Sequence, residues 1–111
     1  MGSEAEVRDR LHDVFKSYVA LAGKEAVGLD GARFAKLCRD AHLVSPPIDG
    51  AAIDLIFTRA KERGARRLSF REFVVALGLV GDALYPGDQD GFGKVRIHVC
   101  AGAAPEAIFE R

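Results

Sequence analysis

The sequence contains no tryptophan, one methionine and two cysteines among its 111 residues, and its 16 Lys plus Arg equal its 16 Asp plus Glu. Zero net charge gives no general affinity for nucleic acid or membranes, so an electrostatic function must be local. No apolar run approaches the roughly 18 residues of a membrane span, and the charged N-terminal segment is unlike a secretory signal. These absences predict an intracellular chain that does not bind membranes, with Cys38 and Cys100 as reduced thiols.

Catalytic and metal-binding motifs are also absent. The histidines are widely spaced, and the sequence holds no HExxH, GxSxG or paired CxxC motif. We therefore predict no enzymatic activity, no catalytic residues, no cofactor and no structural metal site. His42 follows Cys38 by four residues and could share a helix face with it, but two ligands would make only a weak or adventitious zinc site. A structural zinc site needs four ligands.

The sequence is rich in helical periodicity. Apolar residues recur three and four positions apart in four segments, each bounded by start or stop signals. Asp30, Asp49 and Ser69 are placed as N-caps, and Glu72 completes a capping box with Ser69. We predict an all-α, four-helix domain over residues 5–81 and an extended tail over residues 82–111.

An internal repeat orders these helices. A shift of 39 residues aligns Tyr18 with Phe57, Leu29 with Leu68, Asp30 with Ser69, and Phe34 with Phe73. In a paired EF-hand domain, these are the places of the aromatic before the loop, the ribbon aliphatic, the helix cap and the aromatic after the loop. The repeat therefore predicts an EF-hand-like pair whose loops meet in a short two-stranded ribbon through Leu29 and Leu68.

Both loops lack the ligands of a calcium site, which takes about 6–8 oxygens and a bidentate glutamate at the last loop position. The first loop, residues 22–33, has Arg33 at that position. The second loop, residues 61–72, keeps Glu72 there but places cations at the early positions, where they would repel a divalent ion. We predict that these degenerate loops bind no calcium.

Positive charge is concentrated around the second loop. The cations are Arg59, Lys61, Arg63, Arg66, Arg67 and Arg71, and Glu62 is the one acid between the first and last of them. A solvated loop and helix face would explain any one of these residues. The set of six favours an acidic partner, because arginine engages carboxylates bidentately. Nucleic acid is disfavoured, because Phe57, Phe70 and Phe73 lie on inner helix stripes rather than in stacking positions.

Two stretches resemble a known family: GARFAKLCRDAHLV and IDLIFTRAKERGARRLSFREFVVAL. An FAKLC-type helix with a following acidic residue, a D-(I/L)-(I/V)-F helix, and a basic loop before an aromatic-rich helix are features of the tubulin polymerization-promoting protein (TPPP) family. Here they are Phe34–Cys38 with Asp40, Asp54–Phe57, and Arg66 and Arg67 ahead of Phe70 and Phe73. The chain resembles short versions of this family from flagellated protists. Some family members are associated with zinc, so the resemblance leaves weak zinc binding open without assigning residues to it.

This resemblance implies a non-enzymatic module of the cytoplasm, the cytoskeleton or a flagellum that binds tubulin or microtubules and promotes their polymerization or stability. Tubulin's exposed tails are rich in glutamate, so the six cations are the predicted contact surface. The alternative is a protein-protein adaptor, not regulated by calcium, that holds a partner helix in an EF-hand-like hydrophobic groove. We expect a monomer or a weak homodimer.

The tail departs from longer family members, whose glycine-rich C-terminal motif is suspected of contacting GTP. Gly91–Lys94 lacks the spacing and the hydroxyl residue of a phosphate loop, so GTP chemistry is not carried over. Val95, Ile97 and Val99 alternate with other residues after a predicted turn, which predicts a short strand at 94–100. From Ala101 onward we predict a loose end.

Overall fold

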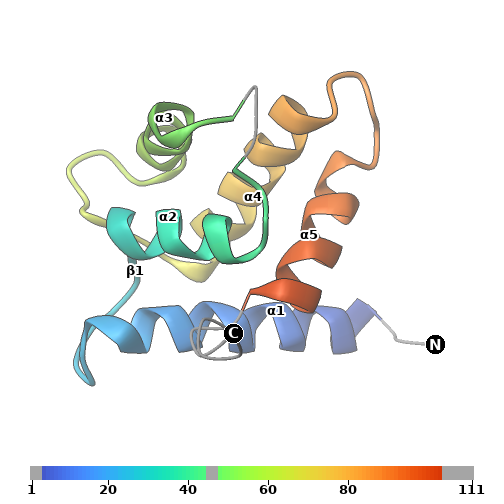
Figure 1. Cartoon of the computed structure of the whole chain (residues 1–111). Helices are drawn as coiled ribbons and strands as arrows, with labels where there is room; N and C mark the ends of the chain where they lie inside the picture. The colour runs from blue at the N-terminus through green and yellow to red at the C-terminus, as the bar shows by residue number, and fades with distance from the viewer. Residues whose placement is uncertain (1–3, 45–47, 104–111) are drawn as a thin grey trace.

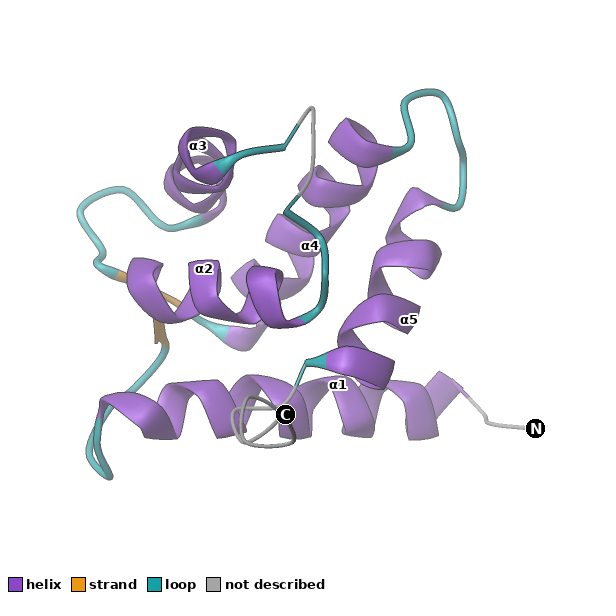
Figure 2. Cartoon of the chain, in the orientation of Figure 1, coloured by secondary structure: helices purple, strands orange, loops and turns teal. Residues whose placement is uncertain are grey.

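The structure, a computed structural model, describes residues 4–44 and 48–103 and is mostly helical (Figures 1 and 2). In chain order the elements are α1 (Glu4–Val19), the 3-10 helix η1 (Ala20–Ala22), β1 (Leu29–Asp30), α2 (Gly31–Asp40), α3 (Gly50–Ala60), β2 (Arg67–Leu68), α4 (Phe70–Leu84) and α5 (Gly91–Gly102). The predicted all-α fold with a short ribbon is confirmed. The described residues form five α-helices where four were predicted.

The predicted helix caps are present at Asp30, Asp49 and Ser69. The Ser69 hydroxyl accepts a hydrogen bond from the Glu72 amide at 3.2 Å, and the Glu72 carboxylate accepts one from the Ser69 amide at 2.9 Å. Asp30 accepts from the Arg33 amide at 2.8 Å. Each cap satisfies amides that the first helical turn leaves without an intrahelical partner.

The two loops meet in an antiparallel ribbon in which Leu29 faces Leu68 and Asp30 faces Arg67. Both leucines are fully buried. Gly28 precedes the ribbon with a φ of 91°, and a Cβ there would lie 2.9 Å from the Leu68 carbonyl oxygen. Glycine is required at this point by both its conformation and the close approach of β2. The ribbon therefore holds the two loops side by side, in the register that the repeat predicts.

The ribbon joins two helix-loop-helix units, which we call the first unit (α1, β1 and α2) and the second unit (α3, β2 and α4). Phe34 and Phe73 occupy equivalent positions after the two loops, and both are fully buried. Their rings approach edge to face, with centroids 6.5 Å apart. The repeated positions therefore build one shared core. The comparison with an EF-hand pair remains an interpretation of this arrangement.

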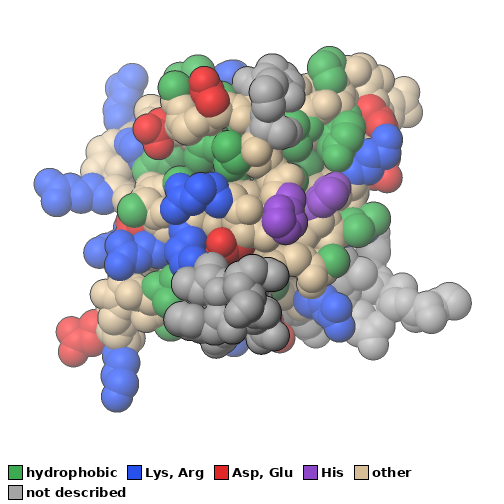
Figure 3. Space-filling view, viewed as in Figure 1, with side chains coloured by type: hydrophobic (Ala, Val, Ile, Leu, Met, Phe, Trp, Pro, Cys, Tyr) green, Lys and Arg blue, Asp and Glu red, His purple; other side chains and the backbone are tan. Residues whose placement is uncertain are grey.

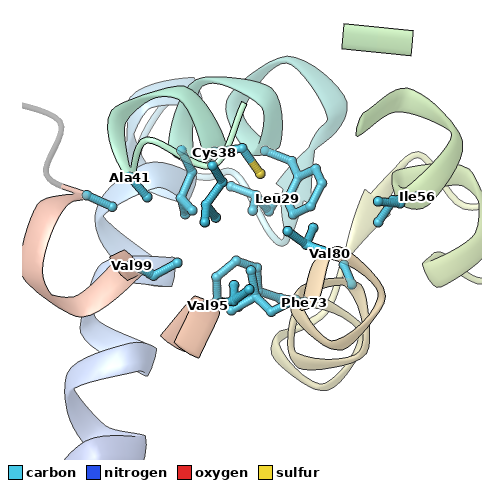
Figure 4. Close-up of a cluster of buried hydrophobic side chains, with 14 of the residues drawn as sticks. Leu29, Cys38, Ala41, Ile56, Phe73, Val80, Val95 and Val99 are labelled. Carbon is cyan, nitrogen blue, oxygen red and sulfur yellow. The ribbon is translucent and has the colours of Figure 1, made fainter. Parts of the chain in front are cut away.

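The prediction of a strand at 94–100 is wrong, because these residues lie within α5. Val95 and Val99 are spaced four residues apart on one helix face and are fully buried, whereas Ile97 is 62% exposed. The alternation of these three residues suggested a strand, but two of them also fit a helical period. Figure 4 shows Val95 and Val99 beside the buried cluster that includes Phe73 and Ala41. Residues 104–111, part of the predicted loose end, lie outside the described residues.

α5 packs against α4, α1 and α2, as the red helix in Figure 1 shows. It approaches α4 most closely where Gly81 meets Gly91: a Cβ on Gly81 would lie 2.6 Å from the Gly91 carbonyl carbon. Backbones this close leave no room for a side chain at either glycine. Among the helices of the described ranges, none is long and apolar enough to cross a membrane.

Candidate interaction surface

The six predicted contact residues come together around the second loop, and we call them the second-loop surface. They are Arg59 in the last turn of α3, Lys61 at its C-cap, Arg63 and Arg66 in the loop, Arg67 in β2 and Arg71 in the first turn of α4. Figure 3 shows Lys and Arg side chains gathered on the side of the molecule where the loops lie. The sequence alone places these residues on one continuous segment. The fold determines how far each side chain is exposed.

These cations are available to a partner. Five of the six side chains are exposed, and Lys61 is half-buried. Among the residues whose side chains the structure describes, 10–44 and 48–103, the ion pairs are Lys16 with Asp13, Arg33 with Asp30, Lys36 with Asp40, and Lys94 with Asp88. None of them includes a member of the second-loop surface. An incoming carboxylate would therefore meet cations that have no resident counter-ion to displace.

The loop that carries these cations is tightly turned. The Lys61 amide donates to the Phe57 carbonyl at 3.1 Å, which ends α3, and the Ala65 amide donates to the Glu62 carbonyl at 2.9 Å. Between them, Gly64 adopts a φ of 82°, a left-handed conformation that glycine accommodates without strain. The chain then enters the ribbon at Arg67. Both ends of the loop are thus held, one by the end of α3 and the other by the ribbon.

The first loop has the same place in the fold and a different charge. Residues 22–33 contain two cations and two acids, a net charge of zero, whereas residues 61–72 contain five cations and two acids, a net charge of +3. In the first loop the Arg33 guanidinium lies 3.4 Å from the Asp30 carboxylate that caps α2. Only the second loop therefore presents an excess of unpaired positive charge.

Metal binding gains no support from the arrangement of side chains. The Glu72 carboxylate, the one remaining calcium-type ligand of the second loop, is already bonded in the capping box of α4. No group of three or more His, Cys, Asp or Glu side chains within the described ranges is placed to hold a metal ion. The absence of calcium binding stays a prediction that a titration can test.

Both thiols are free, as predicted from their number and spacing. Burial raises the pKa of the Cys38 thiol from 9.0 to about 12, and partial burial raises that of Cys100. The expectation that His42 shares a helix face with Cys38 is wrong. α2 ends at Asp40, and His42 is exposed beyond it with a φ of 62°, whereas Cys38 is buried in the core. These two residues are not placed as a pair of zinc ligands.

α5 covers the apolar surface that the adaptor alternative would offer to a partner helix. Its buried residues Val95 and Val99 belong to the same core cluster as Leu37 of α2 and Val80 of α4. The aromatic rings near the second loop point inward as predicted, with Phe73 fully buried and Phe57 and Phe70 half-buried. Among the described residues, these rings are therefore not placed beside the cations as an exposed stacking platform.

The fold and the surface together define a small helical domain of two ribbon-linked helix-loop-helix units, closed by a fifth helix, with a cationic second loop. The chain belongs to the p25-alpha family, whose model matches residues 12–108. This match confirms the resemblance to the tubulin polymerization-promoting protein family. The match extends over α5 and past Gly81, where the predicted domain ended.

Named relatives agree with this assignment. Tubulin polymerization-promoting protein family member 3 of Rattus norvegicus is 29% identical over 103 residues, covering 88% of this chain and 58% of that protein. Family member 2 of Homo sapiens is 26% identical over 90 residues, covering 78% of this chain and 49% of that protein. The chain thus spans about half the length of the relatives it matches.

Proposed function

We propose that this chain is a non-enzymatic module that binds tubulin or microtubules through the second-loop surface and so promotes microtubule polymerization or stability. The observation that carries the proposal is a set of six cations without ion pairs in the described residues, in a chain of zero net charge. The printed names of the relatives, tubulin polymerization-promoting proteins, support the choice of partner.

The physical route is charge complementarity with tubulin's glutamate-rich tails. Guanidinium groups bind carboxylates through two parallel hydrogen bonds, and five of the six cations are arginines. Exposed ion pairs are screened by salt, so binding should weaken as ionic strength rises above about 0.1 M. We place the module in the cytoplasm with the cytoskeleton, with a flagellum as one possible site, and expect a monomer or a weak homodimer.

Pelleting with polymerized microtubules tests this proposal. Reversing three charges with Arg63→Glu, Arg66→Glu and Arg67→Glu should weaken binding about tenfold, because each lost exposed pair is worth roughly 0.5 kcal/mol. The matched control is Arg10→Glu, Lys16→Glu and Arg39→Glu, which reverses three exposed cations on α1 and α2. We call the first triple variant the loop variant. If it is folded and pellets with microtubules as this control does, the second-loop surface is not the contact surface.

The same assay separates the adaptor alternative. Microtubules whose acidic tails have been cleaved should bind the wild-type chain as weakly as intact microtubules bind the loop variant. A helix held in an apolar groove would not depend on those tails. It would also require α5 to leave its buried position, which the measured helix content would report.

A further inference from the structure

A hollow lies beside the second-loop surface, on the first loop. Its lining residues are Ala22, Gly23, Lys24, Glu25 and Ala26 from the first loop, and Arg67 from β2. It has a volume of about 530 Å³. The Ala26 amide donates to the Gly23 carbonyl at 3.2 Å, which closes the turn that forms its wall. The ribbon therefore brings one member of the second-loop surface into contact with a concave part of the first loop.

Two cations line this hollow, Lys24 from the first loop and Arg67 from β2. Lys24 and Arg67 are both exposed, and neither takes part in an ion pair within the described ranges. The position of Arg67 is fixed because it pairs with Asp30 across the ribbon and its Cβ packs against Gly28. Glu25 is the one acidic residue in the lining. An anion entering here would meet two cations and one carboxylate.

The hollow also has apolar surface. Ala22 and Ala26 belong to its lining, and the neighbouring side chains Leu21 and Val27 are 42% and 80% exposed. A glutamate side chain matches this combination, since its methylene groups can contact aliphatic carbon while its carboxylate reaches the cations. An inorganic anion would use only the cations.

We propose that an acidic segment bound to the second-loop surface continues across the ribbon and places one glutamate side chain in this hollow, with its carboxylate between Lys24 and Arg67. Lys24 is then a seventh contact residue and the first loop a second anchor. The identity of the occupant as an acidic segment rests on the proposed function. Glu25 opposes this binding, because its own carboxylate lies at the same hollow.

A synthetic peptide of ten glutamates is a suitable probe, because it extends to about 33–36 Å and the domain measures 39 × 36 × 31 Å. Titrated at low salt into the full chain labelled with nitrogen-15, it should shift the amide resonances of residues 22–26 as well as those of the second loop. Lys24→Glu should weaken binding about twofold, and Glu25→Gln should strengthen it by a similar factor.

Arg10→Glu is the matched control, since it reverses an exposed cation on α1 about 18 Å along the helix from the hollow. The proposal is overturned if Lys24→Glu binds the peptide as the control does, or if the shifted amides are confined to residues 59–71. Loss of microtubule binding by the loop variant, together with wild-type peptide binding by Lys24→Glu, would reject the hollow and keep the proposed function. If the loop variant binds microtubules as tightly as the wild type does, the proposed function is rejected. The peptide titration would then still decide whether a glutamate side chain occupies the hollow.

Discussion

The two helix-loop-helix units share their buried positions and differ at their surfaces. Leu29 and Leu68 form the same ribbon contact, and Phe34 and Phe73 are buried at equivalent places. At the third helical position the first unit has Arg33, paired with its cap, and the second has Glu72, bonded to the Ser69 amide. Core packing constrains the inner positions of such a repeat, whereas loop charge is free to change without loss of the fold.

The second helices of the units also differ in length. α2 ends at Asp40, and α4 continues to Leu84, past the residue equivalent to that end. The additional turns of α4 include Val80 and Gly81, both buried beneath α5. α5 therefore has a docking surface on the second unit that the first unit does not duplicate.

The largest effect should come from filling the contact between α4 and α5. Gly81→Ala would place a methyl group 2.6 Å from the Gly91 backbone, so α5 must shift, at a cost of about 2 kcal/mol in the free energy of unfolding. Gly78→Ala is the matched control on the same helix, because a Cβ there has nothing within 4 Å. It should stabilise the domain by about 0.5–1 kcal/mol. Denaturant unfolding measures both, and stabilisation by Gly81→Ala would contradict the close packing of α5.

The caps should give a smaller effect that compares the units directly. Ser69→Ala removes the hydroxyl that accepts from the Glu72 amide and should cost about 1 kcal/mol. Asp30→Ala should cost slightly more, about 1.5 kcal/mol, because a carboxylate also interacts favourably with the helix N-terminus. Ser17→Ala is the control, since this exposed hydroxyl only donates to the Asp13 carbonyl within α1. If all three variants unfold at the same temperature, the two caps do not stabilise the starts of α2 and α4.

The smallest effect concerns Cys38, which occupies the place of Leu77 in the repeat. Burial raises the pKa of this thiol to about 12, so the folded protein favours the neutral thiol over the thiolate. The free energy of unfolding is therefore unaffected by this thiol below pH 9 and falls as the pH rises from 9 toward 12. At pH 9.5 the loss should be under about 1 kcal/mol. Unfolding of the wild type and of Cys38→Ala at pH 7 and pH 9.5 measures it, and Cys100→Ser serves as the control that removes the half-buried thiol. Identical pH slopes for wild type and Cys38→Ala would contradict the raised pKa.

Local signals in the sequence are sufficient for α1 to α4, for the helix caps and for the ribbon. Asp30 and Ser69 are short polar residues at helix starts, and the repeat pairs Leu29 with Leu68 without knowledge of the fold. α5 was missed because Val95, Ile97 and Val99 alternate over a short stretch, where helical and strand periods both fit. The helical choice depends on burial against α4, which is a tertiary effect.

The candidate surface was predictable only where it is continuous in the chain. Six cations between residues 59 and 71 form a visible cluster in the sequence. Lys24 is distant from Arg67 in the chain, and its place at the same hollow follows from the ribbon and the turn at Gly23. Charge counts along a sequence contain no such information.

The ribbon also has a consequence for the order of events in folding. Leu29 and Leu68 are 39 residues apart, so their contact closes a long loop, and we expect it to form later than the contacts within each unit. A chain that has folded one unit would have the cations of the second loop without the neighbour that fixes Arg67. The complete binding surface would then appear late, and a partially folded chain would compete poorly for an acidic partner.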